Sequence, residues 1–381
     1  MYWRRVFFEL RDAQGRIINP GPMDLRVQQR LGENTIMSAR VHHAYHQVKN
    51  PKILKEDSLI QVNWGTKPTG NETWFGYIHH PQFDSSAPDR NGNVEINYLM
   101  VGTGHLLTDQ RRKTWLKMSD SAIAREIAKQ YGLSSVVHKT SKVHEWLLQD
   151  GESDMAFLTR RAKESGRKFW VENAVLYFVD VAAWSAGKGI VMPEYDVHKD
   201  PNLPTDVLRF QADVGADMPQ QGRQYRRAIH GVDHQTGKMI KSKNADDSKA
   251  RHDVLGYTRA DNMEDLNYQL DAHTISTSEW VGASATLAGD IILTPGQPIK
   301  IKGRAVPKDA HGVWMIVAAD HRLRSYGSAA VGNSMFLTDV KLARNAREDY
   351  ATSDTTMPRL NQKCVPGSDG WKAASMQDIT L

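Results

Sequence analysis

Two glycine-containing stretches could form a nucleotide-binding loop. Gly231 and Gly237 precede Lys238, as in a phosphate-binding loop. However, five residues instead of four separate the glycines, and Met239 stands where a magnesium-binding Ser or Thr is needed. Residues 102–104 (Gly-Thr-Gly) lack the third glycine of a dinucleotide-binding turn, and no strand–helix unit surrounds them. We therefore expect no nucleotide cofactor.

Two serine- or histidine-containing stretches could carry hydrolytic chemistry. Ser165 and Lys168 match the S-x-x-K pattern of acyl-enzymes, but no S-D-N or K-T-G partner motif occurs, and Ser165 falls where a helix is predicted to end. Asp320 and His321 could belong to a catalytic triad with a distant serine, yet they close a predicted strand. We expect no catalytic residue and no enzyme activity.

Clustered histidines are the candidates for a metal site. His42, His43 and His46 form one group, and His79 and His80 form another. On a strand, His42 and His46 share a face, whereas His43 points away. No carboxylate stands at metal-ligand spacing and no H-E-x-x-H motif occurs, so we interpret these residues as polar strand positions and expect no metal.

Basic clusters raise the question of nucleic acid. The three groups are Arg111-Arg112-Lys113, Arg160-Arg161-Lys163 with Arg167-Lys168, and Arg223-Arg226-Arg227. Acidic residues interleave with them, and no stripe of aromatic and basic residues recurs. We interpret the clusters as solvated surface and expect no sequence-specific nucleic-acid binding.

Composition excludes several classes of protein. The chain has 381 residues, and 49 Lys and Arg against 44 Asp and Glu give a net charge of +5. The apolar runs are too short for a membrane helix, no secretory signal is visible, and the single cysteine, Cys364, excludes an internal disulfide. Ten tryptophans favour β-sheet cores and protein interfaces.

Periodicity predicts a mainly β, α+β chain. Alternating residues at 59–64 and 94–99 predict strands, separated by Gly-, Pro- and Asn-rich turns. Helices are predicted before Gly132, between Ser153 and Gly166, and around 262–272, with a hairpin turning at 172–173. The predicted domains are a first β-barrel (1–110), an α/β domain (111–183), a second β-barrel (184–240 plus 290–346), an α/β insertion (241–289) and a C-terminal tail or linker (347–381).

An internal repeat links the two predicted barrels. Residues 54–62 align with 293–301, and with the same ungapped offset of 239 residues 74–78 align with 313–317. Each copy reads as a turn, an alternating strand, a loop and an aromatic-rich strand. The alignment predicts one β-barrel duplicated within the chain, each copy with a small α/β domain; two unrelated barrels are the alternative.

These blocks, in their order, resemble a known family. Residues 119–133, 151–178, 231–238, 293–303 and 312–323 are similar to the baseplate hubs of phage tails, a family that includes late-control-protein-D-like hubs, the N-terminal hub of siphophage tail-associated proteins and the hub of type VI secretion spikes. The most specific block is the helix D-x-x-F-L-x-R-x-A-x-x-x-G, closed by a strand ending in Leu-Tyr-Phe. Its residues are Asp154, Phe157, Leu158, Arg160, Ala162, Gly166, Leu176, Tyr177 and Phe178.

The resemblance implies a structural role. Such hubs form homotrimers whose six barrels make a pseudo-six-fold ring, join the tail tube to a central spike or fibre, and line the DNA conduit used in genome ejection. The implied partners are two further copies, a distal tail or tail tube protein, a tape-measure protein and a spike or fibre protein, without a membrane. The implied location is the virion tail tip or baseplate, assembled in the bacterial host cytoplasm. Because about 35 residues follow position 346, we expect any spike or enzyme to be a separate chain.

Five aromatic residues in or beside the repeated strands are candidates for barrel cores or ring interfaces: Trp64, Trp74, Phe75, Tyr77 and Trp314. Two other functions stay open. A tail-associated cell-wall or glycan hydrolase would need a cleft with paired carboxylates, which sequence alone does not reveal. The hub of a secretion or phage-tail-like injection system would share the fold.

Overall fold

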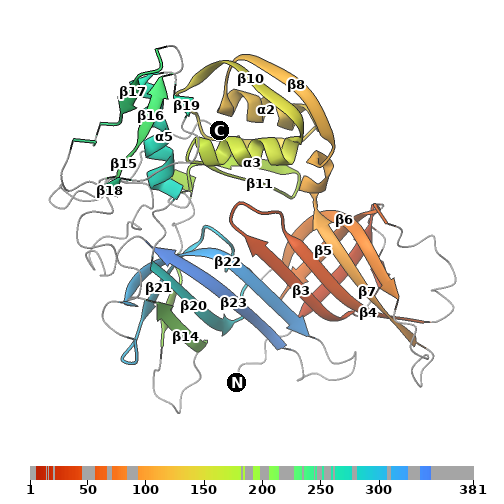
Figure 1. The fold of residues 1–381 in the computed structure, drawn as a ribbon. Coiled ribbons are helices and arrows are strands. Elements are labelled where there is room, and N and C mark those ends of the chain that lie inside the picture. Colours follow the sequence, from red (N-terminus) through yellow and green to blue (C-terminus); the bar gives the residue numbers. More distant parts are fainter. Residues whose placement is uncertain are drawn as a thin grey trace.

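Strands dominate the structure, with three α-helices among the described residues (Figure 1). A computed structural model describes residues 6–13, 15, 17–19, 22–44, 56–66, 71–83, 93–181, 183–184, 192–197, 206–213, 227–233, 236–243, 245–246, 251–252, 259–260, 262–276, 281–306, 310–324 and 335–344. The predicted tail at 347–381 lies outside these residues. None of the helices in the described part has the length and apolar content needed to span a membrane.

The first β half is an antiparallel meander around a tryptophan-rich core. Its sheet order is β3-β4-β7-β6-β5-β1-β2. Trp64, Trp74 and Met100 are fully buried, because alternate residues of these strands point to one face. The strands are β1 (Phe7–Asp12), β2 (Ile17–Asn19), β3 (Pro22–Arg30), β4 (Ile36–Ala44), β5 (Leu59–Gly65), β6 (Asn71–Phe83) and β7 (Asn93–Gly102).

The second β half has its own core around Trp314, Leu287 and Ile299. Its strands are β13 (Glu194–Asp196), β14 (Val207–Asp213), β20 (Val281–Ala288), β21 (Pro298–Lys302), β22 (Gly312–Arg324) and β23 (Met335–Arg344). They pair in the order β14-β20-β23-β22, and β21 then joins β22 to β13.

Five strands of each half have the same neighbours. β3, β4, β7, β6 and β5 follow one another in the first half, and β14, β20, β23, β22 and β21 follow in the same order in the second, all antiparallel. The order along the chain agrees as well. The two halves therefore share one strand topology.

Local irregularities coincide too. β3 and β14 each skip one residue, Met23 and Leu208, in pairing with the next strand, and β6 and β22 likewise skip His79 and Val317. Such bulges bend a strand at a defined point. Aligning them matches Ile78 with Ile316, so the ungapped sequence alignment is one residue out of register here. The reason is that Pro298 and its partner Met315 are one residue closer in sequence than the equivalent pair Leu59 and Tyr77.

The turns before β5 and β21 also correspond. Asp57 and Gly296 both have a left-handed backbone, with φ of 63° and 82°. Their N–H groups donate to the carbonyls of Ile78 and Ile316 at 2.8 and 2.7 Å. The ungapped sequence alignment also places residue 57 over residue 296. It is therefore correct at the start of β5 and β21.

The two halves are joined edge to edge. After its bulge, β22 pairs on its outer side with β3, from Ala318 opposite Arg30 to Arg324 opposite Asp24. One hydrogen-bonded path thus runs from β14 to β2. Within the described residues neither half closes into the predicted barrel, because β22 continues into the other half instead of returning to its own.

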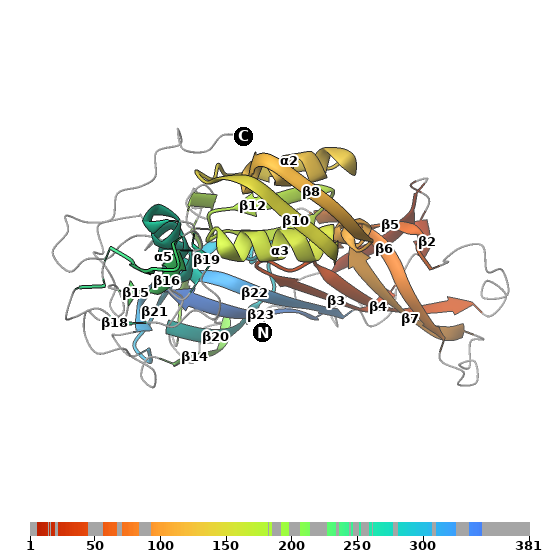
Figure 2. The same cartoon turned by 45° about the horizontal axis from the view of Figure 1, so that its top comes forward.

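An α/β domain lies over the junction of the two halves (Figures 1 and 2). The long ribbon β8 (Gln110–Ser119) and β10 (Val143–Ser153) covers the helices α2 (Asp120–Gln130) and α3 (Asp154–Glu164) on one side. The sheet β11 (Lys168–Glu172), β12 (Val175–Val179) and β9 (Ser134–Val137) covers them on the other. The short 3-10 helix η1 (Thr103–Leu107) connects this domain to β7.

Local sequence explains the two helices. Ser119 and Ser153 are N-caps whose hydroxyls accept from the N–H of Ala122 and Ala156. Gly132 and Gly166 follow the helices with left-handed φ of 67° and 66°, as the predicted helix ends require. The apolar faces of α2 and α3 meet Trp115 and Phe178 in a single core.

A smaller part is built around α5 (Met263–Ser276), whose Leu266 and Leu270 pack on Ile229. Its short strands are β15 (Arg227–Ala228), β16 (His230–Asp233), β17 (Met239–Lys241), β18 (Arg251–His252) and β19 (Arg259–Ala260). α5 also contacts α3, and Lys142 pairs with Asp265. The predicted helix around 262–272 is confirmed.

Candidate functional site: the junction of the β halves

Two arginine–aspartate pairs cross the outer face of the β22–β3 junction. Arg26 on β3 donates from Nε to both carboxylate oxygens of Asp320 on β22, at 2.9 and 3.1 Å. Arg324 on β22 donates from Nε to Oδ1 of Asp24 on β3 at 2.6 Å. Because each pair joins one strand of each half, the pairs fix the register in which the halves meet.

Beneath these pairs, the core of the first half continues into the second. Leu323 and Phe336 belong to the same buried cluster as Leu25, Val27 and Trp64. The His321 ring lies 4.8 Å from the Trp64 ring, centre to centre, and its Nδ1 is 2.9 Å from the Thr338 hydroxyl. The junction is therefore a packed interior, not a surface contact between separate domains.

His321 is neutral in this setting. Burial lowers its pKa to about 3, and the opposing effect of the neighbouring Asp320 charge is smaller. Asp320 itself lies on the outer face with Arg26, away from the imidazole. The Asp320–His321 pair thus serves the junction and lacks the geometry of a catalytic dyad.

The five candidate aromatic residues separate into two groups. Trp64, Trp74 and Trp314 are fully buried, so this chain exposes none of their surface to a partner. Phe75 is 38% exposed and Tyr77 is half-buried on β6. An interface role stays a prediction for Phe75 and Tyr77, whereas the three tryptophans fill cores.

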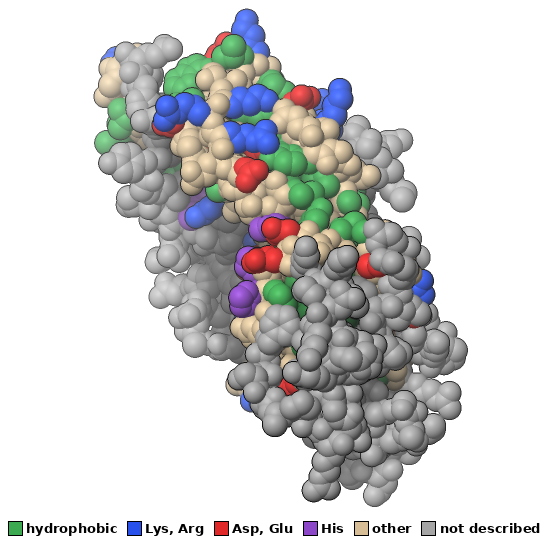
Figure 3. Space-filling view, turned by 90° about the vertical axis from the view of Figure 1, so that its right-hand side faces the viewer, with side chains coloured by type: hydrophobic (Ala, Val, Ile, Leu, Met, Phe, Trp, Pro, Cys, Tyr) green, Lys and Arg blue, Asp and Glu red, His purple; other side chains and the backbone are tan. Residues whose placement is uncertain are grey.

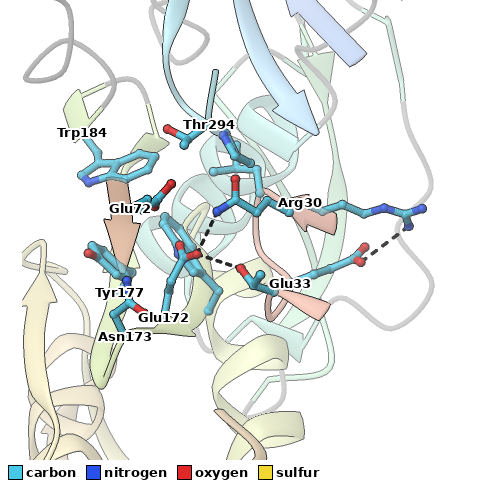
Figure 4. Close-up of a pocket in the computed structure, with 13 residues that line it drawn as sticks. Arg30, Glu33, Glu72, Glu172, Asn173, Tyr177, Trp184 and Thr294 are labelled. Atoms are coloured by element: carbon cyan, nitrogen blue, oxygen red, sulfur yellow. Dashed lines mark hydrogen bonds and ion pairs between the residues drawn. The ribbon is translucent and has the colours of Figure 1, made fainter. Parts of the chain in front are cut away.

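A cavity of about 170 Å³ opens where both β halves meet the α/β domain (Figure 4). Figure 4 shows Tyr177 and Trp184 on one side, Arg30 and Glu33 on the other, and Glu172 between them. Glu172 accepts hydrogen bonds from Thr35 at 2.7 Å and Gln29 at 3.1 Å. These bonds tie the hairpin turn of the α/β domain to the first half.

Aromatic rings and carboxylates dominate the lining of this cavity. Trp170 stacks on Tyr177 at 4.8 Å, and Trp184 stands edge-on to Trp170 at 5.0 Å. Glu33, Glu72 and Glu172 supply the acids, and no Ser, Cys, His or Lys is among the lining residues. Such a lining suits a cationic or carbohydrate group better than a covalent intermediate. Sequence reasoning missed this cavity, because its residues come from segments far apart in the chain.

The hub-like helix block acts as a folding framework. Asp154 begins α3 and is fully buried, and it accepts from Gln149 at 2.9 Å, Tyr131 at 2.8 Å and Arg111 at 2.9 Å. Burial and the Asp154 carboxylate raise the pKa of Tyr131 to about 12. Phe157, Leu158 and Ala162 fill the core, which explains the spacing of the motif.

A second buried network connects α2, α3 and the ribbon. Arg161 donates to Asp120 at 2.6 Å, and both lie within hydrogen-bond distance of Nε2 of His144, at 3.1 and 3.2 Å. Burial alone would raise the pKa of Asp120, but the His144 contact and the Arg161 charge outweigh it and lower that pKa. Asp120 and Arg161 are almost fully buried, so each depends on the other for compensation.

The remaining motif residues have structural roles. The Ser165 hydroxyl donates to the Arg161 carbonyl at 2.8 Å at the end of α3. Gly231 and Met239 lie on the paired strands β16 and β17, so this stretch is a hairpin and not a phosphate loop. His79 and His80 are exposed. In the part of the chain that the structure describes, no three His, Cys, Asp or Glu residues are grouped to hold a metal ion.

Much of the basic charge is paired. Arg111 contacts Asp154, Arg112 contacts Asp150, and Arg160 contacts Glu152. Arg223 and Arg226 lie outside the described residues. The first two basic clusters are therefore largely held in ion pairs within the α/β domain.

The phage tail baseplate hub (GPD) family model matches residues 57–327. The chain belongs to the phage tail baseplate hub family. The match includes the whole α/β domain and strand β22 of the junction, and it begins after β3. By sequence, no curated protein matches.

Solved structures of tail proteins share the hub fold at low identity. The tail protein from Neisseria meningitidis MC58 is 12% identical with a TM-score of 0.64, covering 90% of this chain and 97% of its own. The 43 kDa tail protein of prophage MuSo2 from Shewanella oneidensis is 12% identical with a TM-score of 0.60, covering 89% and 98%. The E. coli c3393 protein, described as a type VI secretion component similar to T4 tail proteins gp27 and gp5, is 13% identical with a TM-score of 0.58, covering 91% and 79%.

Proposed function

We propose that this hub protein has a structural, non-enzymatic role and forms a ring at the phage tail tip or baseplate. Three copies place six equivalent β halves around one axis, join the tail tube to a central spike or fibre, and line the conduit through which the genome is ejected. The observation that carries the proposal is the shared topology of the halves, with coincident bulges in β3 and β14 and in β6 and β22. We infer that the halves are duplicated barrel domains, which let a trimer match a six-fold tube.

The α/β domain offers a surface for the spike, fibre or tape-measure protein. On the outer face of its ribbon, Leu116 and Trp146 are direct cross-strand partners, 64% and 63% exposed. Val143 and Leu148 extend this apolar surface. Exposed apolar patches of this kind are typical of protein-binding sites. A distal tail or tail tube protein would bind the ring of β halves.

The test is the oligomeric state and shape of the purified protein. Light scattering should give about three times the chain mass of 42.9 kDa, and electron micrographs should show a ring with a central opening. Antibody labelling of particles should place the protein at the tail tip. A stable monomer under assembly conditions, with no ring in particles, would rule the proposal out.

The cavity at the junction favours one rival, a tail-associated cell-wall or glycan hydrolase. It gathers Glu33, Glu72 and Glu172 beside aromatic rings. Zymography on host envelope material tests this rival function. If the wild type clears the material and both Glu72→Gln and Glu172→Gln abolish the clearing, the protein is a hydrolase.

The fold likeness to a type VI secretion component favours the other rival, a hub of a secretion or injection system. Its genes would neighbour secretion genes, whereas a phage hub neighbours terminase and tape-measure genes.

A further inference from the structure

The outer edge of strand β22 pairs with two different strands, one before and one after its bulge. Up to Ile316 this edge is occupied by β21 and by the turn at Gly296, and beyond the bulge at Val317 it pairs with β3. The Leu31 N–H donates to the Val317 carbonyl at 2.9 Å, so pairing with the other half begins at the bulge itself.

The equivalent strand of the first half, β6, has the same edge without such a neighbour. Up to Ile78 its outer side is occupied by β5 and the turn at Asp57. Beyond the bulge at His79, β6 runs on to Phe83 and, among the described strands, pairs only with β7. His79, His80 and Gln82 are exposed. Figure 3, which looks onto the side where β6 lies, shows histidine and acidic side chains gathered on this surface.

The equivalent of β3 in the second half, β14, is open as well. Among the described strands it pairs only with β20, so none of them pairs with its outer side. Leu25 and Val27 of β3 are 2% and 0% exposed, because β22 covers them, whereas their counterparts Phe210 and Ala212 are only partly buried. Among the described strands, β14 and the part of β6 beyond its bulge thus leave two open edges, which correspond to the two sides of a junction already formed once within the chain.

We propose that β6 of one copy pairs antiparallel with β14 of the next copy, and so repeats the β22–β3 junction between chains. Transferring the register of that junction places Gln82 opposite Asp213 and Phe83 opposite Ala212. The proposal rests on the proposed trimer and adds to it the strands and the register of its subunit contact. Each copy contributes two different edges, so the contact is head to tail and closes when three copies form a ring.

The chemistry of the edges fits this pairing. The Arg26–Asp320 pair of the internal junction is replaced by Gln211 and Gln82, whose amides can exchange hydrogen bonds in its place. Pro81, at the place of Ala319, has no N–H to donate, so the ladder depends on the residues around it. Pairing would also remove two exposed strand edges, which otherwise favour uncontrolled aggregation.

Disulfide trapping tests the register. In a Cys364→Ser background, which removes the only cysteine, the double variants Gln82→Cys/Asp213→Cys and Phe83→Cys/Ala212→Cys are oxidised. Neighbouring residue pairs in an antiparallel ladder alternate between a wider, hydrogen-bonded spacing and a closer, non-hydrogen-bonded one. One of these two cysteine pairs should therefore form a disulfide readily. The expected product is a covalent ladder up to the trimer on denaturing gels. Each single-cysteine variant, and Gln82→Cys paired with an off-register Gln211→Cys, should stay monomeric on the gel.

The internal junction supplies a matched control. Gln28→Cys/Asp320→Cys has the same register as Gln82 opposite Asp213, and it should lose its free thiols without gaining mass. If light scattering shows a trimer and this control links, but neither intermolecular pair does, the β6–β14 pairing is wrong while the proposed ring stands. If the protein is a monomer, the ring itself fails.

Discussion

Arg324 and Asp24 lie 300 residues apart in sequence and directly opposite each other across the β22–β3 junction, with 2.6 Å between Nε and Oδ1. Together with the Arg26–Asp320 pair, this contact ties the end of the second half to the start of the first. Both side chains are partly exposed, at 44% and 25%. The pair therefore selects the register more than it stabilises the fold.

The Arg324–Asp24 pair should show a small and specific coupling. Arg324→Asp places like charges directly opposite and should lower stability by about 1 kcal/mol, and adding Asp24→Arg should restore most of that loss. Urea unfolding of the four proteins of this cycle measures the coupling. High salt should shrink it, and a coupling unaffected by salt would argue against an ion pair.

Gly76 on β6 should not tolerate a side chain. A Cβ there would lie 2.1 Å from the Trp74 ring and 2.5 Å from the Val101 carbonyl oxygen. Gly76→Ala should therefore destabilise the first half by roughly 1–3 kcal/mol and change the tryptophan fluorescence. Gly282→Ala on β20, where nothing lies within 4 Å of a new Cβ, is the control and should be nearly neutral. Equal effects of the two changes would contradict the packing around Trp74.

His321 should make the junction sensitive to mild acid. Its pKa is about 3 in the fold and near 6.5 in an unfolded chain, so the unfolded state binds more protons between these values. Stability should therefore fall as the pH drops from 7 to 5. His321→Asn keeps a donor for Thr338 but cannot titrate. It should be less stable at pH 7, because it loses the Trp64 contact, and its melting temperature should vary less between pH 7 and 5.

A His321→Asn variant that is as pH-sensitive as the wild type would show that another group controls acid stability. Measurements above pH 5 keep Asp120 ionised, because its pKa is lowered.

Removing one member of the buried Asp120–Arg161 pair should lower the free energy of unfolding much more than replacing both members by apolar residues. Asp120→Asn leaves the Arg161 charge poorly compensated and should lower stability by about 3 kcal/mol. Asp120→Leu combined with Arg161→Met removes both charges and should recover much of the loss. Asp150→Asn, in an exposed pair with Arg112, is the control and should cost under about 1 kcal/mol. Thermal unfolding of the three variants and the wild type measures these differences.

The sequence predicts local structure well and long-range pairing poorly. Ser153, Gly132 and Gly166 mark helix ends in the sequence, because caps and left-handed turns depend on single residue types. The repeat aligns residue 57 with 296, which the structure supports, and slips by one residue at Ile78, because an ungapped alignment cannot follow the one-residue difference in length between the two copies. The edge pairing of β22 with β3 could not be predicted, although alternating charges at Arg322 and Arg324 are compatible with cross-strand pairs.

The exposed ribbon should be needed for assembly but not for folding. Leu116 and Trp146 lie opposite each other on the outer face of β8 and β10, so neither supports the core beneath. Trp146→Ser should leave the melting temperature within a few degrees of the wild type and reduce incorporation into particles, scored by complementation of a deletion phage. Met239→Ser, equally apolar and 70% exposed but distant on β17, is the matched control and should assemble normally. If Trp146→Ser particles form and infect at wild-type levels, the ribbon is not the surface that binds the spike or fibre.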